Sequence, residues 1–296
     1  MKKVIVFGGS GFLGSHVADE LSRQGYEVLI YDTVKSPYLK STQKMVVGSI
    51  LDKNKLESVI KDADYVYHFA AIADIHESAV NPLKTIEINV LGTCYILDLC
   101  VKYGISKFLY ASTVYVYSNH GSFYKTSKQA SELIIENYSK VFNFQSTILR
   151  YGSLYGKRSN SFNSIVKMIK QAILENKITR SGNGEEIRDY INVLDAAKSS
   201  VDMLKLKDLS NHVMITGSQK MKVKDIVNMI NEILDNKLEI EYTNNTQEEH
   251  YVITPYNFKP KVALKHSAEY HHDFGQGILE SIYDIYQELN KDEINQ

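Results

Sequence analysis

The sequence has few of the features that mark secreted, membrane or disulfide-stabilised proteins. Its 296 residues include two cysteines, four prolines and no tryptophan. No stretch approaches the roughly 18 apolar residues that a membrane-spanning helix needs. The apolar run behind the first two lysines, Val4 to Phe7, is too short for the core of a signal peptide. We therefore expect no membrane partner.

The chain also has almost no net charge, with a formal value of −1 at pH 7. The chain has 34 basic and 35 acidic residues, so no field attracts nucleic acid or an anionic membrane. Cys94 and Cys100 fall six positions apart in one predicted helix, where their side chains do not face each other. They are expected to be unpaired core residues in a reducing cytoplasm. The remaining partners are small molecules or other proteins.

Short apolar segments alternate with amphipathic ones through the first half of the chain. Strands are predicted at 4–7, 27–32, 45–47, 65–70, 107–113 and 146–152, with helices at 16–25, 56–60, 86–104 and from 124 onward. This alternation predicts an α/β fold, a Rossmann-like doubly wound parallel sheet with helices on both faces.

The alternation of strand and helix patterns becomes less regular after about residue 156, which predicts a smaller C-terminal lobe. Its last helix is expected to bury one apolar stripe, made of Ile278, Leu279, Ile282, Ile285, Tyr286 and Leu289. Because no proline-rich linker or low-complexity tract separates the two parts, we expect them to pack closely.

The first predicted strand leads into GGSGFLG, with glycines at 8, 11 and 14 and a helix from about Phe12. Such a turn lets the backbone approach a pyrophosphate, which then lies at the positive end of the helix. Asp32 ends the second strand, and a carboxylate there accepts hydrogen bonds from ribose hydroxyls and repels a 2′-phosphate. The unit favours NAD over NADP. The alternative is a glycine-rich turn with a surface aspartate.

Three tyrosines precede a lysine by four positions, at Tyr31 to Lys35, Tyr103 to Lys107 and Tyr124 to Lys128. The first pair runs from a strand into a loop, and the second spans a helix end at Gly104. Only Tyr124 and Lys128 belong to one uninterrupted helix, where they share a face.

A phenol with a pKa near 10 is a poor base at neutral pH. A cation about 4 Å away contributes on the order of 4 kcal/mol at an effective dielectric near 20, or roughly three pKa units. Tyr124 could then exchange a proton with a sugar or alcohol hydroxyl while hydride moves between carbon and nicotinamide. The alternative is an exposed tyrosine and lysine on a helix.

Taken together, several stretches resemble the extended short-chain dehydrogenase/reductase family, specifically its NAD-dependent nucleotide-sugar epimerases and dehydratases. They are GGSGFLGSH (8–16), Asp32, YHFAA (67–71), HES (76–78), NPLKTIEINVLGT (81–93), YASTVYVY (110–117), YKTSKQASE (124–132), LRYGSLYGKR (149–158), GNGEEIRDYINVLDAA (182–197) and ITGSQKMKVKDIV (215–227). The resemblance spans nearly the whole chain.

The resemblance implies a role for each matching position. Thr113 would hydrogen-bond the substrate hydroxyl, Tyr124 would be the acid/base, and Lys128 would bind the nicotinamide ribose and lower the tyrosine's pKa. The NAD contacts would be Gly8, Ser10, Gly11, Phe12, Leu13, Gly14, Asp32, Ser49, Ile50, Phe69, Ala70, Ala71, Asn89, Lys128 and Tyr151. The nucleotide-sugar contacts would be Ser78, Thr113, Ser153, Asn163 and Arg188, with Arg188 on the phosphates.

The chain departs from the family around the proposed acid/base. Only ten residues separate Thr113 from Tyr124, where relatives have a much longer acidic loop. Val114 and Tyr115 stand where the 4,6-dehydratases have an aspartate and a glutamate, so elimination is not favoured.

Further departures concern nucleotide binding. Ser49 stands where relatives often have an aspartate near adenine, and Ser153 replaces a common asparagine. No arginine follows Arg188, although many enzymes for UDP-sugars use a second one on the diphosphate. Lys259 or Lys261 could substitute, or the sugar could be carried by another nucleotide.

The resemblance implies a cytoplasmic NAD-dependent epimerase that oxidises a nucleotide-bound sugar, at C4 in type, and returns the hydride to the other face. A dehydrogenase or 4-keto-sugar reductase with the same catalytic groups, and a non-catalytic dinucleotide sensor, are the alternatives. Residues 1–155, with 190–217 packing back, would bind NAD, and 156–296 would mainly bind substrate.

The sequence also leads to expectations on oligomeric state, pathway and metal binding. Helices at 84–103 and 125–140 would form a homodimer interface, and the pathway would be cell-surface polysaccharide biosynthesis. His266, His271 and His272 are expected to be surface residues, with no metal bound.

Overall fold

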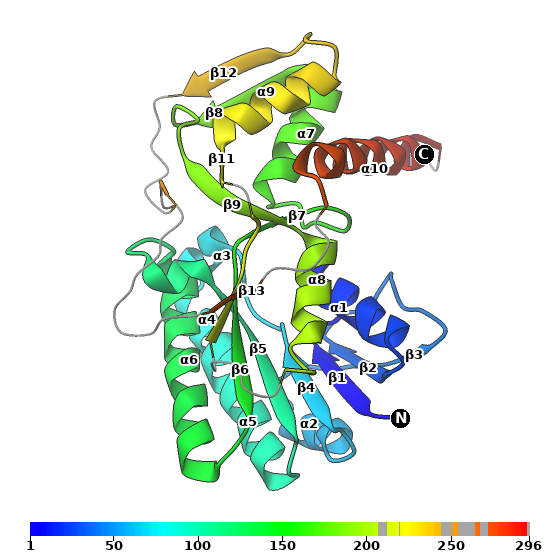
Figure 1. Cartoon of the computed structure of the whole chain (residues 1–296), viewed down its shortest axis with the longest axis vertical. Coiled ribbons are helices and arrows are strands. Elements are labelled where there is room, and N and C mark those ends of the chain that lie inside the picture. The colour runs from blue at the N-terminus through cyan, green and yellow to red at the C-terminus, as the bar shows by residue number, and fades with distance from the viewer. Residues whose placement is uncertain are drawn as a thin grey trace.

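An eight-stranded parallel sheet dominates the computed structural model of the protein, which describes residues 1–206, 212–218, 220–243, 250, 252–253, 264–266 and 272–294. Its strands are β1 (Lys3–Phe7), β2 (Glu27–Asp32), β3 (Gln43–Val47), β4 (Tyr65–His68), β5 (Lys107–Thr113), β6 (Ser146–Tyr151), β10 (His212–Ile215) and β13 (Leu264–His266). They are ordered β13-β10-β6-β5-β4-β1-β2-β3 (Figure 1). The order reverses at β1, as in a doubly wound Rossmann sheet, and the predicted fold class is confirmed.

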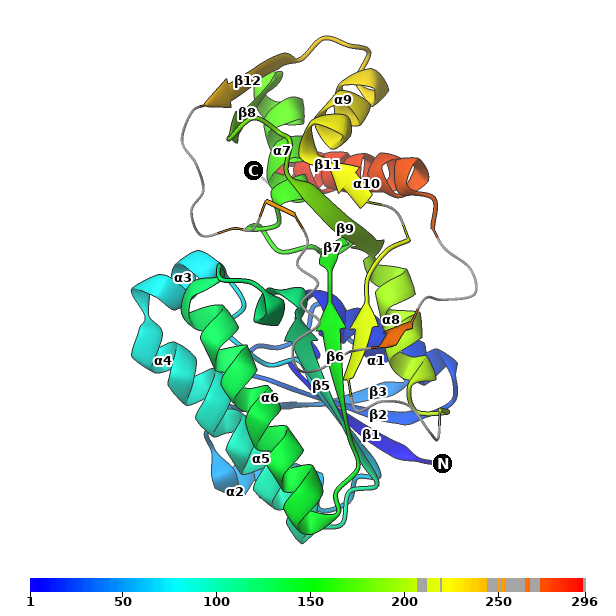
Figure 2. The same cartoon turned by 60° about the vertical axis from the view of Figure 1, so that its left-hand side comes forward.

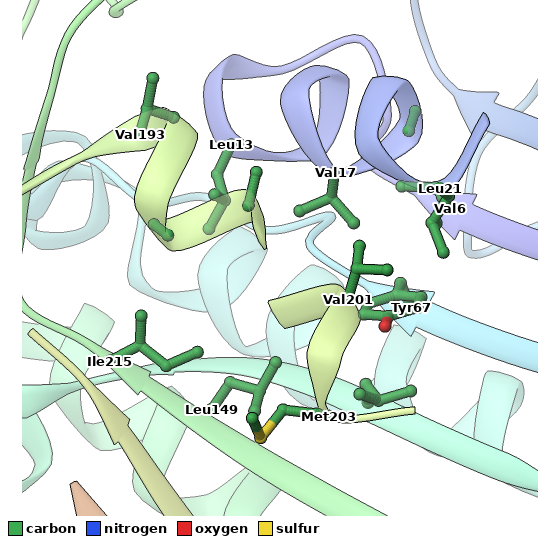
Figure 3. Close-up of a cluster of buried hydrophobic side chains, with 14 of the residues drawn as sticks. Val6, Leu13, Val17, Leu21, Tyr67, Leu149, Val193, Val201, Met203 and Ile215 are labelled. Atoms are coloured by element: carbon green, nitrogen blue, oxygen red, sulfur yellow. The ribbon is translucent and has the colours of Figure 1, made fainter. Parts of the chain in front are cut away.

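Helices cover both faces of this sheet. On one face, α1 (Phe12–Arg23) and α8 (Val193–Asp202) pack against the strands, and Figure 3 shows side chains of both helices meeting residues of β1, β4, β6 and β10. On the other face lie α2 (Lys53–Ile60), α5 (Gly92–Lys102) and α6 (Ser122–Phe142) (Figure 2). Each fully buried aliphatic side chain stabilises the fold by roughly 1.5–3 kcal/mol.

The predicted helix 86–104 is present, but it contains a π-helical turn. The chain forms α3 (Ile75–Val80) and α4 (Pro82–Ile86), then one π-helical turn, η1 (Glu87–Leu91), before α5. Single π turns inside helices are frequent at functional sites. Here the turn contains Asn89, whose side chain is buried beside the cavity described below.

A second group of elements follows β6. It comprises β7 (Ser153–Tyr155), α7 (Ser164–Glu175), β8 (Lys177–Ser181), β9 (Ile187–Asn192), β11 (Lys220–Lys222), α9 (Val223–Ile233), β12 (Glu239–Thr243) and α10 (Phe274–Ile294). The strands form two small sheets, β11-β9-β7 and β12-β8. The helices share a separate apolar core.

Only part of the predicted apolar stripe on α10 is buried. Ile278, Ile282 and Ile285 are buried, but Leu279 and Tyr286 are 47% and 52% exposed. Each of the exposed residues follows a buried one directly, and so projects about 100° further round the helix.

Both cysteines lie on α5 with free thiols, as predicted. Cys100 is fully buried, whereas Cys94 is only half-buried. None of the helices in the described part of the chain is both long and apolar enough for a membrane span.

Candidate active site

A cavity of about 1230 Å³ opens at the carboxyl ends of the central strands. The predicted site residues that line it are Gly8, Ser10, Gly11, Phe12, Leu13, Gly14, Asp32, Ser49, Ile50, Phe69, Ala70, Ala71, Thr113, Tyr124, Lys128, Tyr151, Ser153 and Asn163. It lies at the point where the strand order reverses, the usual ligand position in open α/β sheets. Three predicted residues, Ser78, Asn89 and Arg188, are not among those lining it.

The glycine-rich turn is shaped by close backbone packing. A Cβ on Gly14 would lie 2.2 Å from the Gly8 carbonyl oxygen, and one on Gly8 would lie 2.5 Å from the Ala70 nitrogen. Gly11 is exposed, and its Cβ would meet only that carbonyl, at 3.3 Å. Because α1 has no side-chain cap at Gly11, its first N–H groups fit a diphosphate in this cradle.

The carboxylate of Asp32 is held beside this turn. It accepts hydrogen bonds from the backbone N–H of Ser10 at 2.9 Å and of Val34 at 3.3 Å. The Ser10 hydroxyl donates to the Val34 carbonyl at 2.9 Å. These contacts fix an acceptor where β2 ends, so the residues present fit an adenosine ribose with free hydroxyls.

Tyr124 and Lys128 lie one turn apart on α6, as predicted from their spacing. The Lys128 ammonium lies 6.0 Å from the centroid of the Tyr124 ring and donates to the Ala111 carbonyl at 2.7 Å. Burial lowers the pKa of Lys128 to about 7, opposed in part by the Glu132 carboxylate. At neutral pH Lys128 therefore carries only part of the positive charge that its spacing from Tyr124 led us to expect.

Thr113 ends β5 at the cavity. Its hydroxyl oxygen accepts a hydrogen bond from the Tyr115 N–H at 3.2 Å, so its own proton remains available to a ligand. The connection to α6 is the 3₁₀ turn η2 (Val114–Tyr117) and a left-handed residue, Gly121, with φ of 103°. This compact turn accounts for the shortness of the ten-residue segment between Thr113 and Tyr124.

Ser78 and Asn89 lie outside the cavity lining and hydrogen-bond the start of α6. The Ser78 hydroxyl is buried, accepts from the Tyr124 N–H at 3.1 Å and donates to the Ile75 carbonyl at 2.7 Å. The Asn89 amide bonds both backbone groups of Ile72 and donates to the Ser127 hydroxyl at 2.9 Å. Both side chains thus position the first turn of α6.

A buried ion pair beneath Thr113 was not predicted. Arg150 on β6 and Glu132 on α6 are paired at 2.6 Å, with side chains 2% and 6% exposed. Ser112 donates to the same carboxylate at 2.5 Å, and the Tyr117 hydroxyl bonds the guanidinium. The pair ties the end of β5, turn η2 and α6 together. Its sequence signal is only that Glu132 lies one turn beyond Lys128.

Cationic groups for a diphosphate come from unexpected positions. Arg188 donates to the carbonyls of Ile187 and Val252, both at 3.2 Å. Lys167, one turn beyond Asn163 on α7, lines the cavity instead. Lys259 and Lys261 lie outside the described residues. The spacing of Asn163 and Lys167 was the available signal, but it is common on helices.

His76 and His250 also line the cavity and were not predicted. Tyr115, which stands where the 4,6-dehydratases have a glutamate, lines it too. His272 pairs with Asp195 at 2.7 Å, away from this cavity. His271 lies outside the described residues, among which no three potential metal ligands cluster.

The fold and the site define a Rossmann-type enzyme. The sequence model of the NAD dependent epimerase/dehydratase family matches residues 4–216, and the chain belongs to this family. NAD is accordingly its cofactor.

One relative is similar in sequence, and solved structures are similar in fold. The chain is 30% identical to a putative UDP-glucose 4-epimerase from Methanocaldococcus jannaschii, over 88% of this chain and 94% of the relative. Its fold is similar to a UDP-glucose 4-epimerase from Thermotoga maritima, with a TM-score of 0.84, 24% identity, and 97% and 99% of the two chains covered. It is also similar to an epimerase from Methanothermobacter thermautotrophicus, with a TM-score of 0.87, 22% identity, and 99% and 94% covered.

Proposed function

We propose that the protein is an NAD-dependent 4-epimerase of a UDP-linked sugar. The observation that carries the proposal is the meeting of Thr113, Tyr124 and Lys128 in one cavity with the glycine-rich turn. The similarity to a putative UDP-glucose 4-epimerase over most of both chains supports the reaction and the carrier.

The side chains suit a reversible oxidation. NAD, when bound, supplies the hydride acceptor and donor. Thr113 donates a hydrogen bond to the oxygen of the sugar hydroxyl and holds it near Tyr124, whose phenolate takes the proton of that hydroxyl and later returns it. Lys128 binds the nicotinamide ribose, and its ammonium favours the phenolate. The volume of the cavity leaves room for the ketone to turn its other face before reduction.

Elimination is less well supported than epimerisation. Val114 and Tyr115 follow Thr113, so no carboxylate stands next to it in the chain. A 4,6-dehydratase needs a separate acid and base for the leaving hydroxyl and the C5 proton.

The diphosphate is assigned to the first turn of α7. Asn163 caps this helix and lines the cavity together with Lys167. Among the described residues, no carboxylate forms an ion pair with Lys167, so its charge is available to a phosphate. Ser153 also lines the cavity, and Arg188 would have to turn toward it to bind the diphosphate.

We also assign the two ligands to different parts of the chain. Residues 1–155 with 190–217 would bind NAD and 156–296 would mainly bind substrate; the place of β10 in the large sheet supports this.

A homodimer is supported by exposed apolar side chains on α4, η1 and α6, namely Leu83, Ile86, Leu91, Leu133, Val141 and Phe142. Two free thiols suit the cytoplasm, and cell-surface polysaccharide biosynthesis is the pathway we propose.

The test is turnover of UDP-, GDP-, CDP- and dTDP-hexoses by purified protein whose bound NAD is quantified. NMR should reveal the C4 stereoisomer of a UDP-sugar without net absorbance at 340 nm. Stoichiometric NADH would instead establish a dehydrogenase, and oxidation of added NADH by a 4-keto sugar would establish a reductase. Bound NAD without any turnover would indicate a dinucleotide sensor.

A further inference from the structure

Tyr115 is fixed at the wall of the cavity beside the proposed acid/base. Its ring meets the Tyr124 ring edge-on, with centroids 6.4 Å apart and an interplanar angle of 70°. Gly121 lies beneath it, where a Cβ would approach the Tyr115 ring to 2.8 Å. The short connection after Thr113 therefore builds a specific position for this ring.

His250 completes this wall from a distant part of the chain. Its Nδ1 lies 2.7 Å from the Tyr115 hydroxyl, and the two rings meet edge-on at 6.1 Å. Burial lowers the pKa of His250 to about 4, aided by Arg188, Arg180 and His120 and opposed by Asp74. The imidazole is neutral at physiological pH.

The Tyr115–His250 pair then presents one hydrogen-bond donor and one acceptor, and no charge. If Nδ1 accepts from the phenol, the phenol oxygen accepts further bonds and Nε2–H donates. If Nδ1–H donates to the phenol oxygen, the phenol donates and Nε2 accepts. A sugar hydroxyl matches either arrangement, because it both donates and accepts. A carboxylate only accepts, and so leaves the acceptor of the pair facing a negative charge.

Building on the proposed 4-epimerase function, we propose that Tyr115 and His250 bind a hydroxyl of the sugar beside Tyr124 and select an uncharged hexose over a hexuronate. Both side chains line the same cavity as Tyr124. Tyr115 occupies one of the two positions at which the 4,6-dehydratases have an acid. The position that supplies an acid in those enzymes would here contribute to recognition of the sugar.

Binding and turnover test this assignment separately. Calorimetry with NAD-loaded protein should give a Kd for UDP-glucose at least about tenfold below that for UDP-glucuronate. Tyr115→Phe and His250→Ala should each raise the Kd and KM for UDP-glucose about five- to tenfold, the loss of one hydrogen bond, and change kcat less than about threefold. Neither should weaken UDP-glucuronate binding.

Two further variants separate recognition from folding. His250→Asn keeps an acceptor near the place of Nδ1 and should restore the Kd for UDP-glucose to within about threefold of wild type. Tyr283→Phe removes a hydroxyl from a tyrosine on α10 that is 62% exposed, and should change nothing. Bound NAD and the melting temperature show that each variant is folded.

Different results would overturn the role of the Tyr115–His250 pair and the 4-epimerase function. Tighter binding of UDP-glucuronate than of UDP-glucose by wild type overturns the inference, even if both are epimerised. Equal losses for both sugars in Tyr115→Phe, or a fall in kcat alone, overturn it as well. Failure of wild type to turn over any UDP-sugar overturns the 4-epimerase function, whereas the calorimetric preference still decides the role of the pair.

Discussion

The two walls of the cavity are built in different ways. One wall comes from the ends of β1, β2, β4, β5 and β6 and the helices that follow them, and includes Asp32, Thr113 and Tyr124. The other combines segments far apart in the chain, with Asn163 at the N-cap of α7, Lys167 on that helix and His250 beyond β12. Consecutive strand ends must meet at one edge of a parallel sheet, so the first wall follows from local patterns and the second does not. Chemistry is assigned to the first wall, and substrate choice to the second wall together with Tyr115, which follows β5 and contacts His250.

The largest effect is expected from the acid/base on the first wall. Tyr124→Phe removes the phenol proton while Phe keeps the ring, so kcat should fall roughly 10²- to 10⁴-fold. Bound NAD should stay at the wild-type level, measured by absorbance after denaturation. Tyr103→Phe is the matched control, because Tyr103 also precedes a lysine by four positions but lies at the end of α5, away from the cavity. A similar loss of kcat in both variants would show that Tyr124 is not the acid/base.

The burial of Lys128 predicts a pH dependence of stability. Its pKa is about 7 in the folded protein and near 10.5 when unfolded, so between these values the unfolded chain binds the extra proton. The free energy of unfolding of NAD-free protein should therefore rise with pH in this window, by up to about 1.4 kcal/mol per unit. Lys128→Met should remove that slope in urea titrations from pH 7 to 9.5, and Lys140→Met, which removes an exposed cation of α6, should not. An unchanged slope in Lys128→Met would contradict a deprotonated buried lysine.

A smaller effect is expected at the cofactor end of the first wall. Asp32→Ala removes charge-assisted hydrogen bonds to the ribose, each worth about 1.5–3 kcal/mol, so the Kd for NAD should rise roughly 10- to 100-fold. The preference over NADP should shrink at the same time. Titration of apoprotein with both dinucleotides measures this, with Asp62→Ala at an exposed turn as control. If NAD and NADP bind Asp32→Ala in the wild-type ratio, Asp32 does not select the cofactor.

The sequence predicted the first wall well because its signals are short-range. Strand limits at 27–32 and 107–113 agree with β2 and β5 residue for residue, and the spacing of Tyr124 and Lys128 placed both on α6. The π turn at Asn89 was missed, because an extra residue in a helical turn leaves no compositional mark. The contact between Tyr115 and His250 joins positions 135 apart, and no local pattern reports it. Arg188 matched a family motif, yet its guanidinium bonds backbone carbonyls.

The smallest effect is expected on the second wall. Lys167→Gln removes one exposed charge beside Asn163, so the KM for the UDP-sugar should rise about three- to tenfold, as for a single partly screened contact with a phosphate. Because the interaction precedes the chemical step and is unchanged by it, kcat should stay within about twofold. Lys170→Gln, on the same helix but outside the cavity lining, should match wild type. The difference between the two variants should narrow as salt is raised from 0.05 to about 0.5 M, since screening shortens the reach of an exposed charge. A salt-independent loss, or a loss in kcat, would mean that Lys167 shapes the reacting geometry, and substrate choice and chemistry would then not divide between the two walls.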